Sequence, residues 1–271
     1  MKSISEEEER TQRRRRILLI EELLKEDIKR YKGKQIPGDV NVRKKILKEL
    51  LARRPARYAK AEFFIIQNRY LREELERKGI VDETFIPPYK ENLCLWKGDI
   101  TALACDVIVN SAAPDLLGPF DLEFPGVDLE IHTSDGVQLR YECNEIIKMK
   151  KRNLFAGEAI MTTAHNLPCK FIMHTVAPQL FGEATQEKLL LLGKCYTACL
   201  ERAAQNENIK SIAFCCLGTG NNGFPKEKAA WSAIAHVHNY LVKHEDRFKV
   251  IFCVHNDEDF AIYQEFLNRL D

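Results

Sequence analysis

Three glycines stand close together in the segment 217–225, directly after a fully apolar stretch of the chain. Gly218, Gly220 and Gly223 free the backbone amides around them to wrap a pyrophosphate, and Pro225 presets a helix whose positive end faces that anion. The spacing is neither GxGxxG nor GxxxxGK(S/T), so the Rossmann and P-loop families are disfavoured. We interpret the segment as an anion-binding loop, with a plain glycine-rich connection as the alternative.

A second residue that could do chemistry is Asn110, which ends the predicted strand Asp106–Asn110 after three apolar residues. Ser111, Ala112 and Ala113 follow, and such small side chains let a bulky ligand approach the backbone. The side-chain amide of Asn110 can both donate to and accept from sugar hydroxyls. A turn-forming asparagine after a strand is the alternative, and this segment by itself favours it.

Asp128 lies near the start of a helical segment that begins after Gly126. The amides and the dipole of a first helical turn favour an anion, so the carboxylate of Asp128 either caps the helix or works as a base. His132 comes four residues later, one turn deeper, and we interpret it as a structural histidine packed beneath the loop.

Another carboxylate, Asp99, follows Gly98 in a tight turn after a short apolar strand. It can cap a helix through the nearby Thr101, as aspartate often does at helix starts. It can equally accept a hydrogen bond from an exocyclic amine such as that of adenine. The sequence around Asp99 leaves both interpretations open.

Short apolar strands alternate with helices in the second part of the chain. The predicted strands are Leu93–Trp96, Asp106–Asn110, Glu158–Thr162, Lys170–Val176, Ser211–Leu217 and Lys249–Val254. The predicted helices are Val127–Lys150, Thr185–Asn206, Lys226–His244 and Asp257–Leu270. This alternation is typical of a three-layer α/β sandwich around a largely buried sheet. Ligands of such folds bind at the carboxyl ends of strands, where the polar residues described above are found.

Residues 1–80 differ in composition, because they are dense in charge, nearly free of glycine and helical in period. Three predicted helices carry apolar stripes, and the last of them ends at Gly79. Pro87-Pro88 marks a linker, so we predict a helical extension over 1–90 and an α/β domain over 91–271. We expect the stripes to pack on the α/β domain; the alternative is a protein-docking module.

The bulk composition argues against several classes of partner. Lys plus Arg total 41 and Asp plus Glu 40, so the net charge of +1 gives no electrostatic reason to bind nucleic acid or membranes. No apolar run reaches the roughly 18 residues of a membrane span, and the acidic start resembles no targeting signal. Nine cysteines without C-x-x-C spacing fit reduced thiols. We predict a cytoplasmic protein.

Taken together, these motifs resemble the macrodomain family. Gly98–Thr101, the strand that ends at Asn110, Gly126-Val127-Asp128 with Ile131-His132, and Gly218–Pro225 occur in family order and at family-like intervals. The closest resemblance is to the zinc-containing protein-ADP-ribosyl hydrolase macrodomains, which carry a helical amino-terminal extension and act in microbial ADP-ribosylation systems. It covers residues 36–270 and implies a three-layer α/β/α macrodomain sandwich with that extension.

The resemblance implies a site for ADP-ribose, free or attached to a mono-ADP-ribosylated protein. Asp99 and Ile100 would face adenine, while Asn110 and Asp128 would face the distal ribose. In active relatives, water attacks the anomeric carbon of that ribose, so Asn110 and Asp128 are the candidate catalytic residues. The other implied ligand-binding residues are Gly126, Val127, Gly218, Thr219, Gly220, Asn221, Asn222, Gly223 and Phe224.

Departures from the family pattern concentrate at the distal-ribose end. The positions of the zinc-binding Cys, His and Cys hold Pro119, Phe124 and Gly126, none of which binds a metal, so no zinc is expected. Ala113 replaces the second Asn of the Asn-Ala-Ala-Asn motif, and Asn222 stands where a bulky apolar residue is usual. Gly126 restores a Gly-Val-Asp sequence like that of zinc-independent macrodomains, which hydrolyse ADP-ribosyl esters using the Asp.

We therefore expect an ADP-ribose-binding macrodomain that acts in ADP-ribosylation signalling with weak or absent hydrolysis and without a cofactor. One alternative is an active metal-independent hydrolase that removes ADP-ribose from modified proteins. The other is that the helical region is the functional part, a docking module carried on a macrodomain scaffold.

Overall fold

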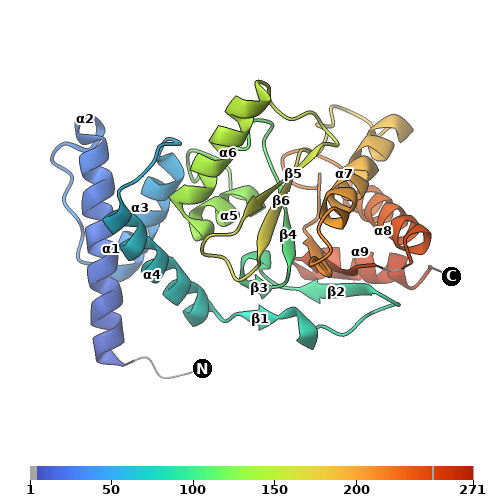
Figure 1. Cartoon of the computed structure of the whole chain (residues 1–271), viewed down its shortest axis with the longest axis horizontal. Coiled ribbons are helices and arrows are strands. Elements are labelled where there is room, and N and C mark those ends of the chain that lie inside the picture. Colours follow the sequence, from blue (N-terminus) through green and yellow to red (C-terminus); the bar gives the residue numbers. More distant parts are fainter. Residues whose placement is uncertain (1–4, 246, 271) are drawn as a thin grey trace.

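The computed structural model of the chain describes residues 5–245 and 247–270. Helices form the amino-terminal part: α1 (Glu6–Glu26), α2 (Ile28–Tyr31), α3 (Val40–Arg53) and α4 (Ala61–Lys78). The remaining helices are α5 (Val127–Asp135), α6 (Val137–Lys150), α7 (Gln186–Ala204), α8 (Lys226–Lys243) and α9 (Asp257–Leu267), with short 3-10 turns at Glu83–Phe85 and Ile100–Ala102. Figure 1 shows the extension on one side of the α/β unit.

A six-stranded sheet lies at the centre, in the order β2-β8-β7-β4-β6-β5. Its strands are β2 (Leu93–Lys97), β4 (Val107–Ser111), β5 (Ala159–Thr163), β6 (Phe171–Thr175), β7 (Ser211–Phe214) and β8 (Lys249–Val254). Only the edge strand β5 is antiparallel to its neighbour among the described strands of this sheet. The predicted mixed α/β sandwich is confirmed, and each predicted strand matches a strand of this sheet.

The alternation of side chains along each strand explains the three layers. In β4, Val107 and Val109 enter one hydrophobic core, and Ile108 enters the other. Helices α7, α8 and α9 cover the first face, while α5 and α6 cover the second (Figure 1). Because both faces are covered, the strands are mostly apolar, as buried parallel strands are, and the polar residues Asn110 and His174 stand out in them.

The helical extension has a small hydrophobic core of its own. Leu19, Ile20, Leu47 and their neighbours on α1, α3 and α4 pack on one another, and of the described residues of the α/β unit only Val137 joins this cluster. The expectation that the stripes pack on the α/β domain is therefore wrong for most of their length. Three helices bury enough surface among themselves, and only the end of α4, at Leu75, enters a core of the α/β unit.

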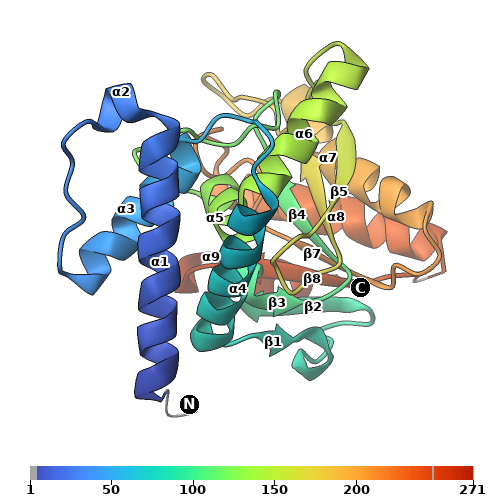
Figure 2. The same cartoon turned by 60° about the vertical axis from the view of Figure 1, so that its left-hand side comes forward.

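Polar contacts join the extension to the α/β unit. Gln67 on α4 accepts a hydrogen bond from the amide of Val137 at 3.1 Å, and Asn68 accepts from Gln138 and Asn166 at 2.7 and 3.1 Å. Figure 2 shows α4 between α1 and the remainder of the fold. The strand β1 (Val81–Asp82) pairs with β3 (Leu103–Ala104), so residues that precede the predicted linker at Pro87-Pro88 already form part of the α/β unit. The division near residue 90 stays an interpretation.

The predicted continuous helix Val127–Lys150 is wrong in one respect, because it breaks at Gly136 into α5 and α6. Gly136 has φ +94°, a conformation that favours glycine. A Cβ at this position would lie 2.6 Å from Nε2 of Gln67, so the side chain from the extension also needs the space. The sequence prediction treated Gly136 as an interior helix residue, and the side chain that contacts the break comes from a residue 70 positions away in the sequence.

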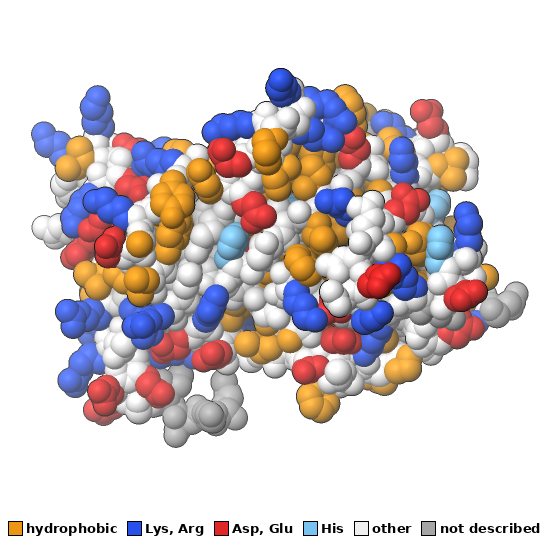
Figure 3. Space-filling model, in the orientation of Figure 1, with side chains coloured by type: hydrophobic (Ala, Val, Ile, Leu, Met, Phe, Trp, Pro, Cys, Tyr) orange, Lys and Arg blue, Asp and Glu red, His pale blue; other side chains and the backbone are white. Residues whose placement is uncertain are grey.

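Charged side chains of both signs are interspersed over the face seen in Figure 3. None of the helices in the described part of the chain combines the length and the apolar character that crossing a membrane requires.

Candidate functional site

The carboxyl ends of the parallel strands bring the predicted loops to one edge of the sheet. Asn110 lies near the end of β4, and residues 112–126 lead from β4 into α5. Residues 215–225 follow the neighbouring strand β7, while residues 98–102 follow β2. This is the edge at which open α/β sheets bind their ligands.

Asn110 and Asp128 are in direct contact at this edge. Nδ2 of Asn110 donates a hydrogen bond to Oδ1 of Asp128 over 2.7 Å. Asn110 is fully buried, and its Oδ1 has no donor among the described residues. A buried amide oxygen without a partner is costly unless a ligand or water supplies the donor. The two predicted catalytic residues therefore form a pair with one acceptor left to fill.

The carboxyl group of Asp128 is poised to change its charge close to neutral pH. Burial raises the pKa of Asp128 from 3.8 to about 6, and the hydrogen bond from Asn110, the Ala113 amide and the charge of Arg140 limit the rise. Nε2 of His132 lies 3.4 Å from Oδ1 of Asp128. Burial and the nearby Arg140 hold the pKa of His132 well below 6.5, so this imidazole is neutral and the contact is not an ion pair.

His174 is a part of this site that the sequence analysis missed. It pairs with Asn110 in the β4–β6 register, and its Nδ1 lies 3.2 Å from Nδ2 of Asn110. Its Nε2 lies 2.9 Å from the hydroxyl of Thr162. Burial lowers the pKa of His174 to about 4, so a neutral ring accepts from Asn110 and donates to Thr162. The amide of Asn110 is thereby held with Nδ2 toward the protein. A single histidine in an apolar strand was the signal.

The glycine-rich loop supports itself with its own residues. The amide of Phe224 donates to the carbonyl of Gly218 over 3.0 Å, and that of Gly223 donates to Gly220 over 3.0 Å. Phe224 is 3% exposed and belongs to the main core, so its ring lies under the loop. Nδ2 of Asn222 donates to the carbonyls of Ala177 and Pro178 at 2.8 and 3.2 Å. These two residues shape the loop.

The middle of the same loop is open to an anion. The amides of Gly220, Asn221 and Asn222 donate to no acceptor in the described part of the chain. Gly218 has φ +84°, which turns the loop away from the strand direction. Successive free amides of this kind form a nest for phosphate oxygens. Thr219 instead turns its hydroxyl to the carbonyl of Cys216 at 2.9 Å.

Asp99 occupies the end of the site near the extension. Its Oδ1 accepts from the amide of Thr101 at 2.9 Å and from the Thr101 hydroxyl at 2.6 Å, so the capping interpretation is confirmed. Its Oδ2 forms an ion pair with Lys78 at the end of α4. Burial opposes the charge of Asp99, but these partners hold its pKa below 3.8. Ile100 is buried in the turn that follows.

The loop that precedes α5 contains the three positions that the resemblance in sequence assigned to zinc ligands. Pro119, Phe124 and Gly126 stand there, and no group of three His, Cys, Asp or Glu side chains fit for a metal occurs in the described residues. The ring of Phe120 lies over the guanidinium of Arg140 at 4.5 Å, and Phe124 is 57% exposed. The first helical turn of α5, from Val127, has no side-chain cap, so its amides also face this region.

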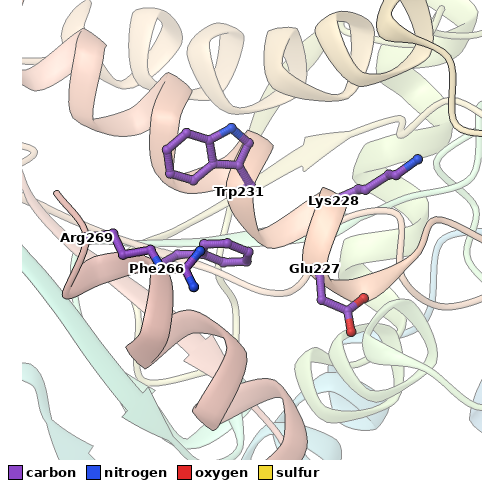
Figure 4. A pocket seen from close by; sticks show the side chains of 5 residues that line it. All are labelled: Glu227, Lys228, Trp231, Phe266 and Arg269. Carbon is purple, nitrogen blue, oxygen red and sulfur yellow. The ribbon is translucent and has the colours of Figure 1, made fainter.

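A separate surface cavity of about 390 Å³ lies between α8 and α9. Trp231 and Phe266 line it with ring centroids 5.6 Å apart, together with charged side chains (Figure 4). Its lining residues are Glu227, Lys228, Trp231, Phe266 and Arg269. None of them belongs to the loops described above, and we do not count the cavity as part of the site.

Two further residues at this edge were missed as well, because their partners are distant in the sequence. Lys78 reaches Asp99 from α4, and Arg140 lies on the buried side of α6. The only sequence signal for Arg140 was a charge between Leu139 and Cys143, two core residues of one helix face. Such a signal does not say what the charge contacts.

Known proteins resemble this chain along most of its length. A protein-ADP-ribose hydrolase of Treponema medium is 39% identical over 253 residues, which are 92% of this chain and 96% of the relative. A protein-ADP-ribose hydrolase of Staphylococcus aureus is 39% identical over 221 residues, which are 80% of this chain and 81% of the relative.

Solved structures agree with this similarity. The Oceanobacillus iheyensis macrodomain with ADP has a TM-score of 0.61 and 33% identity, and covers 68% of this chain and 94% of its own. The Trypanosoma brucei macrodomain in complex with ADP-ribose has a TM-score of 0.63 and 25% identity, over 78% and 91% of the two chains. Residues 109–233 match the Macro domain family. With the fold and the loops at one sheet edge, these similarities show that the chain belongs to the macrodomain family.

Proposed function

We propose that this macrodomain binds ADP-ribose, free or attached to a protein, at the carboxyl edge of its sheet. The observation that carries the proposal is the Asn110–Asp128 pair, which leaves the buried Oδ1 of Asn110 without a donor. A ribose hydroxyl is such a donor, and the free amides at 220–222 suit the pyrophosphate. The complexes of the Oceanobacillus and Trypanosoma macrodomains with ADP and ADP-ribose support the same ligand class.

Calorimetric titration with ADP-ribose tests this proposal. We expect Asn110→Ala to weaken binding by roughly 10- to 100-fold, because a buried hydrogen bond to the ligand is lost. Asn208→Ala, on an exposed turn, is the matched control and should bind as the wild type does. A wild-type protein that takes up no ADP-ribose would refute the proposal.

Hydrolysis of the ADP-ribosyl bond is the second candidate activity, and the environment of Asp128 favours it. With a pKa of about 6, this carboxylate is mostly ionised at neutral pH and can accept a proton from an attacking water. The similarity to protein-ADP-ribose hydrolases over most of the chain supports the same activity. Ala113 lacks the amide that orients the distal ribose in the family, so we propose that turnover is slow.

We further propose that this hydrolysis needs no zinc. Zinc takes three or four side-chain ligands from Cys, His, Asp or Glu, and the residues at the family positions are Pro119, Phe124 and Gly126. None of these side chains has a donor atom, so they do not fit the metal. In hydrolysis without zinc, Asp128 orients or deprotonates the attacking water, and Asn110 fixes the distal ribose.

Release of ADP-ribose from a mono-ADP-ribosylated protein tests the second candidate. The rate should survive a chelator and fall by about 10²- to 10⁴-fold in Asp128→Ala, the usual contribution of a positioned base. Asp257→Ala is the control, since that side chain is 91% exposed. Unchanged turnover in Asp128→Ala would remove the role of Asp128. Binding without release would leave the protein as a reader of ADP-ribose.

Three other predictions from the sequence keep that status. They are the cytoplasmic location, the lack of nucleic-acid and membrane partners, and, as an alternative only, a docking role for the helical extension.

A further inference from the structure

Arg140 connects the helical extension to the loop that leads into the Asp128 helix. Its Nε donates to the carbonyl of Leu117 over 2.5 Å, and its Nη2 donates to the carbonyl of Pro119 over 2.9 Å. On the other side, Nη1 donates to the carbonyls of Ala52 and Arg54 at 2.5 and 2.7 Å. One guanidinium thus holds two segments that are more than 60 residues apart in the sequence.

The hydrogen bonds of the Arg140 side chain go to backbone carbonyls and, among the described residues, to no carboxylate. Arg140 is 4% exposed, and burial lowers its pKa to about 10, so it remains charged at neutral pH. The carbonyl of Ala52 is among the last four of α3, which have no partner within the helix and form its negative end. The Phe120 ring covers the guanidinium with its face, 4.5 Å from Cζ. Helix end, loop and ring are therefore assembled around one cation.

The loop held in this way determines where the distal-ribose end of the site lies. Asp128 follows Pro119 by only nine residues. Gly118 lies against the ring of His132, and Nε2 of that ring is 3.4 Å from Oδ1 of Asp128. Gly118 has φ +68°, and a Cβ there would lie 2.4 Å from the His132 ring, so the fit is close. A shift of residues 117–120 would therefore change what stands above Asp128.

We propose that Arg140 is a positioning residue of the ADP-ribose site, through which the helical extension holds the loop 117–120 over Asp128. The inference rests on the proposed function for its effect on ligand, but the clamp itself is a property of the free protein. It assigns the extension a role in the site: the end of α3 is the fixed point to which the loop is tied. The rigid guanidinium fork suits a junction of five carbonyls, those of Leu117, Pro119, Leu51, Ala52 and Arg54, better than the single ammonium of lysine does.

The first experiment compares Arg140→Lys with Arg16→Lys in the full chain. Arg16 is also a buried arginine, hydrogen-bonded to Tyr70 over 3.0 Å, but it joins α1 to α4 within the extension and does not contact the loop. Both variants replace one buried guanidinium with an ammonium, and urea unfolding of each gives the general loss of stability against which the exchange is compared. Hydrogen exchange of peptides over residues 115–126 should become about tenfold faster in Arg140→Lys alone. Equal exchange in the two variants would overturn the clamp.

The second readout separates positioning from mere loss of folded protein. A smaller folded fraction lowers the measured amount of active sites but leaves KM and the ADP-ribose Kd of the remainder unchanged. We expect Arg140→Lys to raise KM and Kd severalfold, and Arg16→Lys to leave both unchanged. Unchanged KM and Kd in Arg140→Lys would reduce Arg140 to a structural tie.

The pH dependence of ADP-ribose release gives a third readout, because the positive charge of Arg140 lowers the pKa of Asp128. The groups around that carboxyl are Asn110, the Ala113 amide, Asp115, His132, Arg140, Cys143 and Cys215. Arg140→Met removes the positive charge, so the pKa of Asp128 should rise. The pH at which the rate of ADP-ribose release falls to half on the acid side should therefore be higher in Arg140→Met, whereas Arg140→Lys should leave it unchanged. A midpoint that moves equally in both variants contradicts the assignment.

Phe120→Ala keeps the proposal testable where a change of Arg140 prevents folding. The ring is 41% exposed, so its removal spares the core but uncovers the guanidinium. Exchange in residues 115–126 should rise about two- to fivefold. No change in that exchange would overturn the clamp. Wild-type protein that shows the protected loop but neither binds nor releases ADP-ribose would refute the proposed function and leave the clamp standing.

Discussion

The two loops that flank the site are stabilised in opposite ways. The segment 218–224 closes on itself through the Phe224 amide and the Gly218 carbonyl, and its aromatic ring is buried directly beneath it. The segment 117–126 has two phenylalanines that are both exposed, and its carbonyls are held by Arg140 from another helix. The first loop has its support within its own sequence, and the second depends on residues far away.

This difference fits the parts of the ligand that the loops are proposed to hold. A pyrophosphate is the same in every ADP-ribosyl compound, so a self-contained amide nest suits it. The distal ribose is where the linkage to a protein lies, and there the chain has a loop whose position is set by the extension. On the proposed assignment, changes in the extension alter the ribose end of the site without disturbing the pyrophosphate end.

The largest expected effect comes from matched Phe→Ala changes in the two loops. Phe224→Ala should lower the free energy of unfolding by about 3–5 kcal/mol, because a ring that is 3% exposed leaves a cavity in the main core. Phe120→Ala should cost less than about 1 kcal/mol, since its ring is 41% exposed. Urea unfolding of both variants measures the difference. Similar costs for the two rings would show that the loops do not differ in their support.

The next effect concerns Asp128, whose charge is unfavourable to folding. Its pKa is raised from 3.8 to about 6, so its contribution to stability is full below pH 3.8 and is lost as the pH rises through 6. The difference is worth about 3 kcal/mol. Asp128→Asn should therefore stabilise the protein by up to about 3 kcal/mol at pH 8 and hardly at pH 4.

Asp106→Asn is the control with the opposite sign. Burial opposes the charge of Asp106, but Lys170 and the amides of Lys210 and Ser211 hold its pKa below 3.8. Its neutral variant should lose stability at pH 8, where the wild-type carboxylate is ionised. Urea unfolding at both pH values gives the comparison. A stabilisation by Asp128→Asn that is equal at pH 4 and pH 8 would contradict the raised pKa.

The same contrast explains what the sequence could predict. The sheet strands, the glycine loop and the position of Asp128 after Gly126 follow from local periodicity and turn chemistry, and the structure has each of them. Three other features depend on contacts with another part of the chain. They are the break at Gly136, the ion pair of Lys78 with Asp99 and the hydrogen bonds of Arg140 to distant backbone carbonyls. His174 lay between these cases, since its polar side chain stood out in an apolar strand while its partner Asn110 comes from the neighbouring strand.

A smaller effect is expected from adding a methyl group to one glycine of each loop. Gly218 has φ +84°, and a Cβ there would lie 3.1 Å from side-chain atoms of Leu192 and Phe224. Gly218→Ala should therefore cost about 1–2 kcal/mol and weaken ADP-ribose binding. Gly126 has extended backbone with φ 163° and nothing within 4 Å of an added Cβ, so Gly126→Ala should change stability by less than about 0.5 kcal/mol. Thermal unfolding and titration of both variants decide, and a larger cost at Gly126 would reverse the contrast.

The smallest effect tests whether the glycine loop is self-supporting or relies on its neighbour. Asn222→Ala removes two hydrogen bonds to the carbonyls of Ala177 and Pro178, and should cost about 1 kcal/mol. Gln179→Ala is the control, since its exposed amide makes one bond of 3.4 Å to Asn221. Because the Phe224–Gly218 closure persists in both variants, we expect ADP-ribose affinity to fall by no more than about threefold in Asn222→Ala. A much larger loss of affinity would mean that the segment 177–180 supports the pyrophosphate loop as Arg140 supports the segment 117–120, and the distinction between a self-contained loop and a tethered one would no longer hold.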